Sequence, residues 1–332
     1  MVKLRILSGA DVREAITMSE TIDIVARAFA QLSAGQAIVP DRIAFSIERH
    51  NGVPLFMPAY LAESDDLGVK IAAVYPNNLQ SGMPTIFAIV IVLEASTGRP
   101  LAIMDGTYLT ALRTGAASGV ATRLLSRRDA HEVAIFGAGA QGRTQLEGVC
   151  EVRDIRRAWV FDTRAEALKR YVSEMGSMGS RIPADVRAAA SPEEAVRDAD
   201  IICTATTSSE PVFNDADLKP GVHINAIGSY TPRTREIPGE TIVRAKVVTD
   251  SLSAVLADGA GDLTVPIREG LITSSHVYAD LGEIVMGIKA GRQSDDEVTV
   301  FKAVGNAVQD VSVAGEVMKA ALNRDLGIDV EI

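Results

Sequence analysis

The chain has 332 residues, of which 47% are hydrophobic and 23% charged, and its formal net charge at pH 7 is −10. This composition is typical of a globular protein, and the length suffices for two domains, or one large one, with cores that need no disulfide or metal. The acidic balance, without a block of lysines and arginines, argues against nucleic acid or an anionic membrane surface as the partner.

Cysteines, histidines and apolar runs narrow the class of protein further. Cys150 and Cys203 suggest no disulfide framework, which fits a reducing compartment. The four histidines are not spaced as metal ligands, so we expect no metal site. Residues 1–10 do not resemble a targeting segment, and the longest apolar run, residues 86–93, is too short to span a bilayer. We therefore expect a cytoplasmic protein that binds no membrane.

The N-terminal part predicts helices followed by a mostly antiparallel sheet. Ser8 and Ser19 are each expected to cap a helix, the second helix running through Ala34 and ending at Gly35. A hairpin turn is expected at Ala95–Gly98. The predicted strands are residues 42–47, 55–60, 68–74, 85–94 and 100–105.

Residues 108–125 predict a helix rich in Ala, Gly, Ser and Thr, whose small side chains would let another backbone or a flat ligand come close. After this helix, strands alternate with helices, and Ser191 and Pro192 begin one of the connecting helices. This order predicts a doubly wound parallel sheet. Its strands are expected at residues 132–136, 158–162, 200–206, 223–228 and 246–250.

The C-terminal part predicts a long helix that begins at a capping box, Ser294–Glu297, and runs to about Asn323. Its apolar stripe comprises Phe301, Val304, Val308, Val311, Met318 and Leu322. We expect this helix to return to the N-terminal region, so that residues 1–118 and 306–332 form one domain and residues 119–305 the other. The fold class is α/β, a Rossmann domain plus an α+β domain of N-terminal sheet and C-terminal helix.

One glycine-patterned turn is the most informative motif. A short apolar strand, residues 133–136, leads directly into Gly137-Ala-Gly-Ala-Gln-Gly142, and a helix follows. Gly137 permits the tight turn, Gly139 lets the backbone approach a pyrophosphate, and Gly142 lets the helix pack on the strand. We therefore expect Gly137, Gly139, Ala140 and Gln141 to bind a dinucleotide.

Asp162 ends the next predicted strand, where a carboxylate binds a ribose 2′-hydroxyl and repels a 2′-phosphate. This favours NAD(H), and NADP(H) is the alternative because Arg164 could pair with a phosphate if the carboxylate turned away. Small and hydroxylated residues follow two further strands, where ligands lie in such folds, although they are also ordinary loop residues. They are Thr204, Ala205, Thr206, Gly228 and Ser229.

The candidate chemical groups are a few charged residues. Lys70 is either an ammonium in a dry pocket, able to donate or accept a proton, or a lysine on the solvent face of its strand. Arg42 and Arg113 could each bind a carboxylate bidentately or form surface ion pairs. Thr114 adjoins Arg113 and could reach a cofactor phosphate. Asp310 either orients Lys70 or an arginine, or is a solvated charge.

Segments along nearly the whole chain resemble the ornithine cyclodeaminase and mu-crystallin family. They are Gly68–Lys70, Met83–Thr85, Met104–Ala117, Gly137–Gln141, His223–Gly228, Leu281–Ile284 and Val308–Val311. The resemblance implies a two-domain homodimer in which Arg42, Lys70 and Arg113 line the substrate site, the arginines taking the substrate's carboxylate. It also implies that the glycine turn and Thr114 hold a nicotinamide dinucleotide.

Two departures from the cyclodeaminase pattern bear on the activity. Cyclodeaminases have a Glu two residues before a Met-Pro pair and an Asp after the fourth Rossmann strand, where this chain has Leu55 and Tyr230. The resemblance therefore favours NAD(P)H-dependent reduction of a cyclic ketimine, Δ1-pyrroline-2-carboxylate and also its six-membered homologue Δ1-piperideine-2-carboxylate, to the L-amino acid, which is L-proline for the five-membered ring. The alternatives are alanine dehydrogenase activity, ornithine cyclodeaminase activity and a non-enzymatic, cofactor-dependent ligand-binding protein.

Overall fold

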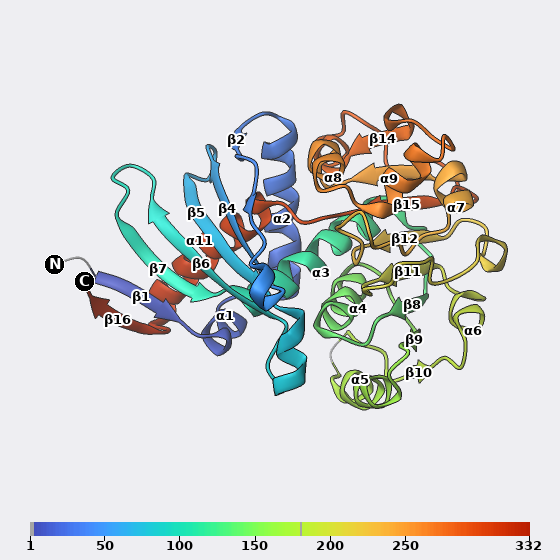
Figure 1. Ribbon diagram of the computed structural model, residues 1–332, viewed down its shortest axis with the longest axis horizontal. Coiled ribbons are helices and arrows are strands. Elements are labelled where there is room, and N and C mark those ends of the chain that lie inside the picture. The colour runs from blue at the N-terminus through green and yellow to red at the C-terminus, as the bar shows by residue number, and fades with distance from the viewer. Residues whose placement is uncertain (1–2, 180) are drawn as a thin grey trace. The chain divides into compact units, whose positions relative to one another are not determined.

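A computed structural model describes residues 3–179 and 181–332 of the chain. The chain divides into two compact units, one of Met1–Arg113 with Asn306–Ile332 and the other of Thr114–Gly305. The division falls within helix α3 (Gly106–Leu125), so that Arg113 belongs to the first unit and Thr114 to the second. Figure 1 labels elements of both units where there is room for a label.

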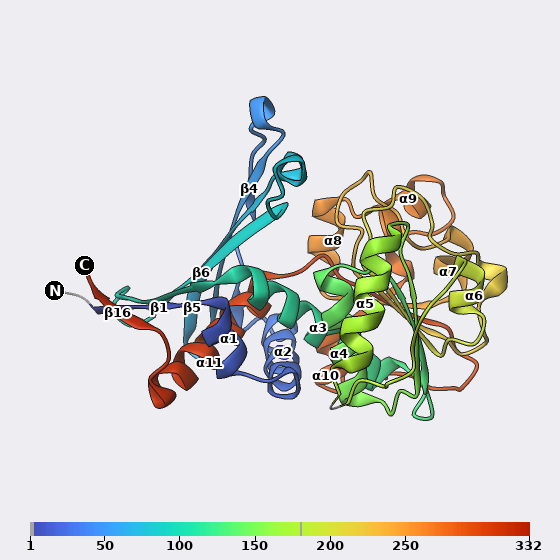
Figure 2. The same cartoon turned by 90° about the horizontal axis from the view of Figure 1, so that it is seen from below.

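The first unit is built on an eight-stranded sheet in the order β16-β1-β7-β6-β5-β4-β2, with β3 also paired to β4. Among the described strands, β1 and β7 pair in parallel and the other neighbours are antiparallel. The strands are β1 (Lys3–Leu7), β2 (Ala37–Ile38), β3 (Ile43–Ala44), β4 (Val53–Leu61), β5 (Asp66–Val74), β6 (Ile86–Glu94), β7 (Pro100–Asp105) and β16 (Ile328–Glu331). Helices α2 (Met18–Ser33) and α11 (Ala307–Arg324) cover one side of this sheet, and α1 (Gly9–Ala15) contacts α11 (Figure 2).

Helix α11 lies close to β5, and Gly315 allows this approach. A Cβ added at Gly68 would lie 3.4 Å from Val311 Cγ2, and one added at Gly315 would lie 2.2 Å from Asp66 Oδ1. Because alternate residues of a strand share a face, Asp66 and Gly68 are followed on this face by Lys70. The packing of α11 therefore covers the side of β5 on which Lys70 lies.

The second unit is a sheet in the order β10-β9-β8-β11-β12-β15-β13-β14, in which every described pair is parallel. This confirms the predicted doubly wound sheet. The strands are β8 (Glu132–Phe136), β9 (Arg157–Phe161), β10 (Val186–Ala188), β11 (Ile201–Thr204), β12 (His223–Ala226), β13 (Lys246–Thr249), β14 (Val277–Asp280) and β15 (Thr299–Lys302). The helices after α3 are α4 (Ala140–Val152), α5 (Ala165–Ser177), α6 (Pro192–Val196), α7 (Gly239–Arg244), α8 (Leu252–Asp258), α9 (Gly261–Arg268) and α10 (Leu281–Val285). Figure 2 shows α4 and α5 on one side of this sheet and α6 and α7 on the other.

The small residues of α3 serve helix packing in the second unit. A Cβ at Gly115 would lie 2.2 Å from the carbonyl oxygen of Thr144 in α4, and one at Gly148 would lie 2.2 Å from the carbonyl oxygen of Gly115. The two backbones thus touch, which only glycine permits at these positions. Of the two partners that the sequence left open for α3, the structure shows another backbone.

Two predictions of helix starts were wrong. Ser19 is not a cap, because α2 begins one residue earlier, at Met18, and Thr17 and Glu20 form a reciprocal capping box there. Ser8 does cap α1, as predicted. Ser294–Glu297 does not begin the C-terminal helix either, since α11 starts at Ala307 with Asn306 as its cap.

The apolar stripe predicted for that helix was partly wrong for the same reason. Phe301 lies in the buried strand β15, and Val304 lies in the connection that follows it. Leu322 is on α11 but is 56% exposed. A buried strand and a helix share short apolar spacings, so local pattern could not separate them. The strand predicted at residues 42–47 was also too long, since β3 is only Ile43–Ala44.

Candidate functional site

Three buried charged side chains from distant parts of the chain meet in the first unit. Lys70 Nζ lies 2.7 Å from Asp310 Oδ2, and Arg113 Nε donates a hydrogen bond to Asp310 Oδ1 at 2.9 Å. The residues are 3%, 0% and 5% exposed, for Lys70, Asp310 and Arg113 in turn. Lys70 is therefore not on a solvent face, and Asp310 is not a solvated charge. Asp310 has the orienting position that the sequence left as one of two alternatives.

The start of α11 positions this cluster. Asn306 caps the helix, and its N–H donates to Gln309 Oε1 at 2.8 Å. The same amide oxygen accepts a hydrogen bond from Arg113 Nη1 at 3.0 Å. Asp310 follows in the first turn, where the helix dipole favours a carboxylate. Sequence reasoning had not identified Gln309, although it stands beside Asp310 in the Val308–Val311 segment.

The cluster contains more positive than negative charge. Burial lowers the pKa of Lys70 to about 8, with the Asp310 carboxylate acting in the opposite direction and Arg113 and Arg42 adding to the lowering. Arg42 is half-buried just before β3. The structure thus brings Arg42, Lys70, Arg113 and Asp310 into one electrostatic environment. One carboxylate among these cations leaves a site suited to an anionic ligand.

The glycine turn in the second unit has the geometry that a dinucleotide requires. Gly137 has φ +101°, and a Cβ there would lie 2.5 Å from the carbonyl oxygen of Ala205. A Cβ at Gly142 would lie 2.0 Å from the carbonyl oxygen of Gly137, whereas one at Gly139 would meet nothing within 4 Å. Gly139 caps α4 without a side-chain hydrogen bond, so the N–H groups that begin at Ala140 and Gln141 can face an anion. These residues fit a pyrophosphate.

Asp162 lies beside this turn and holds it. Its carboxylate accepts hydrogen bonds from the Ala138 N–H and the Arg164 N–H, each at 2.8 Å, and pairs with the Arg164 guanidinium at 3.2 Å. Burial acts to raise the pKa of Asp162, but the hydrogen bonds from Arg164 and Ala138 lower it below its ordinary value. The carboxylate is therefore ionised and faces the turn, and Arg164 is paired with it.

A buried acid that sequence reasoning missed, Glu236, joins the loops after β11 and β12. It accepts hydrogen bonds from Thr204 Oγ1 at 2.9 Å and the Thr206 N–H at 2.6 Å. It also accepts from the N–H groups of Gly228 at 2.7 Å and Ser229 at 3.1 Å. The predicted cofactor residues of the two loops are thus held together. Glu236 lies in an irregular segment, and its only signal is an acid directly before the apolar Ile237.

Asp262 binds the backbone of Glu236 and pairs with Lys302. Asp262 Oδ1 accepts a hydrogen bond from the Glu236 N–H at 2.7 Å, and its Oδ2 pairs with Lys302 Nζ at 3.0 Å. All three residues are fully buried. Burial and the nearby Asp262 carboxylate raise the pKa of Glu236, while Lys302 acts in the opposite direction.

Thr114, the remaining predicted cofactor residue, is buried in α3 next to the glycine contact with α4. Within the described residues, no three His, Cys, Asp or Glu side chains are grouped as metal ligands would be. None of the helices among residues 3–179 and 181–332 combines the length and the apolar character that a membrane span needs.

Comparisons with known proteins agree with these features. A sequence profile described as the ornithine cyclodeaminase/mu-crystallin family matches residues 2–325. A Δ1-pyrroline-2-carboxylate reductase of Bacillus cereus is 40% identical over 330 residues, which cover 98% of this chain and 99% of that protein. The structure of the Thermococcus litoralis Δ1-pyrroline-2-carboxylate reductase in complex with NADH and L-proline has a TM-score of 0.94 and 41% identity, over 98% of this chain and 100% of that one. An archaeal alanine dehydrogenase dimer with bound NAD has a TM-score of 0.91 and 34% identity, over 100% of both chains.

Proposed function

The chain belongs to the ornithine cyclodeaminase/mu-crystallin family, and from that premise we propose that it is an NAD(P)H-dependent oxidoreductase that reduces a cyclic ketimine. The substrate is Δ1-pyrroline-2-carboxylate and the product L-proline, with Δ1-piperideine-2-carboxylate as a further substrate. The observation that carries the proposal is the buried group of cations around Asp310. The Bacillus and Thermococcus relatives are Δ1-pyrroline-2-carboxylate reductases, which supports the five-membered ring as the substrate.

The roles proposed for Lys70, Arg113 and Asp310 rest on their contacts, and the role proposed for Arg42 rests on the family resemblance. Arg113 and Arg42 hold the carboxylate of the imino acid, since a guanidinium binds a carboxylate through two parallel hydrogen bonds. Lys70 holds the proton that the ring nitrogen needs, and Asp310 orients Lys70 and Arg113. The nicotinamide cofactor, when bound, supplies the hydride. Holding both groups in place accounts for much of the acceleration in such a transfer.

The rate of reduction should fall as the pH rises above about 8, the value to which the pKa of Lys70 is lowered. Below this pH Lys70 is an ammonium that can donate its proton. Above it, the fraction of protein with a protonated Lys70 falls about tenfold per pH unit. Oxidation of L-proline needs the neutral amine and should rise through the same pKa. The measurement is kcat/KM in both directions between pH 6 and 10. In Lys70→Arg the fall in reduction rate above about pH 8 should be absent, because a guanidinium keeps its proton throughout this range. The proposal fails if the reduction rate of that variant still falls above this pH.

Binding of the cofactor should depend on Asp162. We propose that the glycine turn, Asp162 and the loops joined by Glu236 bind NAD(H). Asp162→Ala should weaken NADH binding about tenfold, because a charge-assisted hydrogen bond to the ribose is lost, and should affect NADPH much less. Fluorescence titration with both reduced cofactors measures this. A preference for NADPH in the unaltered protein would show instead that Arg164 governs the choice.

Alanine dehydrogenase activity is the second candidate, favoured by the likeness to the archaeal enzyme. The distinguishing assay follows NADH consumption with Δ1-pyrroline-2-carboxylate and, separately, with pyruvate plus ammonia. Consumption only in the second case would remove the ketimine proposal. Release of ammonia from L-ornithine would indicate a cyclodeaminase, and ligand binding without any turnover would indicate a non-enzymatic protein.

We propose that the protein is a homodimer formed through the uncovered side of the first unit's sheet. Large apolar side chains on or beside β3 and β6 are 41–61% exposed; they are Ile43, Phe45, Phe87 and Ile89. A monomeric surface rarely exposes such a patch. Light scattering should give twice the 35.2 kDa chain mass, and Phe87→Asp should shift it toward the monomer. A monomeric mass for the unaltered protein at micromolar concentration would contradict this.

A cytoplasmic location is proposed from the cysteines. Cys150 and Cys203 are both free and buried, in α4 and β11. Burial raises the pKa of both thiols, so they are unreactive and need no oxidising compartment.

A further inference from the structure

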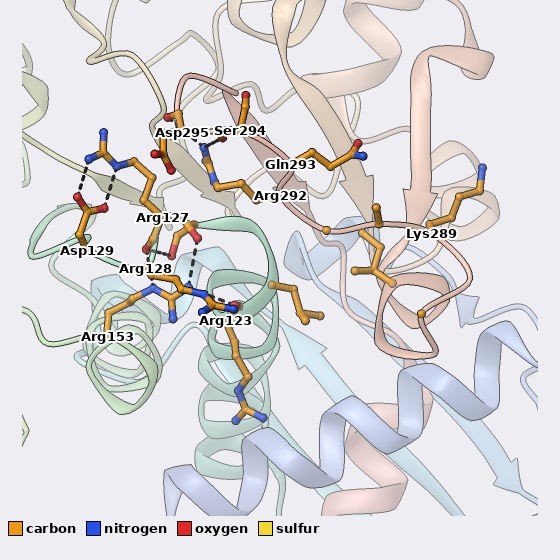
Figure 3. A pocket seen from close by; sticks show the side chains of 16 residues that line it. Arg123, Arg127, Arg128, Asp129, Arg153, Lys289, Arg292, Gln293, Ser294 and Asp295 are labelled. Carbon is orange, nitrogen blue, oxygen red and sulfur yellow. Dashed lines mark hydrogen bonds and ion pairs between the residues drawn. The ribbon is translucent and has the colours of Figure 1, made fainter.

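The second unit contains a cationic cavity of about 730 Å³ that the proposed function does not use (Figure 3). Its volume lies within the range of about 300–1,000 Å³ that is usual for small-molecule sites. Two acids line it, Asp129 and Asp295. The cations that line it are Arg123, Arg127, Arg128, Arg153, Lys289 and Arg292. This excess of positive charge stands in a chain whose net charge is −10.

The cavity and the glycine turn lie at opposite ends of the parallel strands. Residues 123–129 connect the end of α3 to the start of β8, and residues 289–295 precede β15. Gly137, in contrast, follows the end of β8. Because the strands run in the same direction, the cavity lies at their amino ends and the turn at their carboxyl ends. A ligand in the cavity therefore does not overlap the dinucleotide.

Backbone carbonyls hold two of the arginines without neutralising them. Arg292 donates to the carbonyl oxygens of Leu125 at 2.6 Å, Glu297 at 2.6 Å and Gly221 at 3.0 Å. Arg153 donates to the carbonyl oxygens of Arg127, Val152, Thr122, Arg123 and Ser126. Burial, followed by repulsion from Arg128, Arg292 and Arg123, lowers the pKa of Arg153. The guanidinium groups are thus fixed close together by uncharged acceptors, with Glu297 and Asp295 acting on Arg292 through their charge only.

The other cations differ in how far they are paired. Arg127 is neutralised by Asp129 through two hydrogen bonds of 2.7 and 3.0 Å. Arg128 is exposed, and Lys289 is half-buried, with its Nζ 5.2 Å from the centre of the Tyr278 ring. Neither pairs with a carboxylate of the described residues. Both can therefore contact a ligand without breaking an existing ion pair.

We propose that this cavity binds a small molecule that carries two or more phosphate groups. Arg128 and Lys289 add their charges to those of the fixed Arg153 and Arg292, so a single carboxylate would leave most of this charge unbalanced, whereas a phosphate chain brings three or four negative charges to one place. Arginine forks also match the oxygen geometry of phosphate. The chain of phosphates could be free or borne by a nucleoside.

The test is calorimetric titration of the NADH-saturated protein, in which the glycine turn is occupied, at constant ionic strength. The probes are tripolyphosphate, ATP and AMP. We expect saturable binding of tripolyphosphate and ATP, at one site per chain, and much weaker binding of AMP. Equal affinities would indicate recognition of the phosphate chain alone, and tighter binding of ATP would indicate a nucleotide.

Two variants locate the binding. Arg128→Ala combined with Lys289→Ala should weaken tripolyphosphate binding at least about tenfold, because two charged contacts are lost. Arg170→Ala, which removes an exposed arginine from α5, should leave it unchanged. Thermal unfolding of each variant verifies the fold. The proposal is overturned if neither polyphosphate binds saturably, or if the double variant binds tripolyphosphate as tightly as Arg170→Ala does. Turnover is not measured, so the result is independent of the proposed reaction.

Discussion

Replacing Lys70 by Met is expected to lower kcat for ketimine reduction by about 10²–10⁴-fold, the usual contribution of a positioned proton donor. Methionine has a similar length but no proton to give. The affinity for NADH should stay within about twofold, because the groups proposed to bind its pyrophosphate and ribose, in the glycine turn and at Asp162, are not altered. Steady-state kinetics and fluorescence titration measure the two quantities.

The stability of this variant separates a chemical role from a structural one. Burial of the Lys70 ammonium is itself unfavourable, and Arg113 still pairs with Asp310 when Lys70 is absent. The free energy of unfolding should therefore change little. Lys169→Met, an exposed lysine on α5, is the control and should leave turnover unaltered. Unchanged kcat in Lys70→Met would remove the proton-donating role.

Replacing Asp310 by Asn is expected to lower the free energy of unfolding by about 3 kcal/mol, because two buried cations then lose their common anion. It should also move the fall in reduction rate to lower pH. The Asp310 carboxylate is what raises the pKa of Lys70 against burial, so its loss lowers that pKa below the present value of about 8. Urea unfolding and the pH profile of kcat/KM measure these effects.

Asp325→Asn serves as the matched control, since Asp325 ends the same helix but its side chain is 95% exposed. Its change in unfolding free energy should stay below about 0.5 kcal/mol, as for most surface ion pairs. The double variant Lys70→Met with Asp310→Asn should be more stable than the sum of the single effects predicts, because one of the unpaired cations is gone. An unshifted pH profile in Asp310→Asn would show that this carboxylate does not control Lys70.

Local sequence predicted the strand, the glycine turn and the helix that follows it because these parts are close together in the chain. The strand, the glycine turn and the start of α4 occupy residues 132–142, and Asp162 follows at the end of the next strand. Gly137 has a positive φ, and a Cβ at Gly142 would lie 2.0 Å from the carbonyl oxygen of Gly137, so glycine is needed at both positions for local steric reasons. Glu236 escaped prediction because its partners come from two loops, up to 32 residues away, and no spacing in its own segment marks it.

The substrate half depends on contacts that no local pattern contains. Asp310 is 197 residues from Arg113 in the chain, and the alternation of β5 is the same whether Lys70 is covered or solvated. The start of α11 was misplaced as well, since an apolar buried strand and an apolar helix face differ little over four residues.

The amino-acid sequence by itself therefore determined the α/β class, the parallel sheet, the dinucleotide turn and the identity of the charged residues, because these follow from short-range sterics and from residue chemistry. Only the tertiary structure decided that α11 covers β5, that Lys70 and Asp310 are buried against each other, and that Glu236 joins two loops. The physical reason is that burial sets the pKa and pairing of a charge, and burial is a property of packing between distant segments.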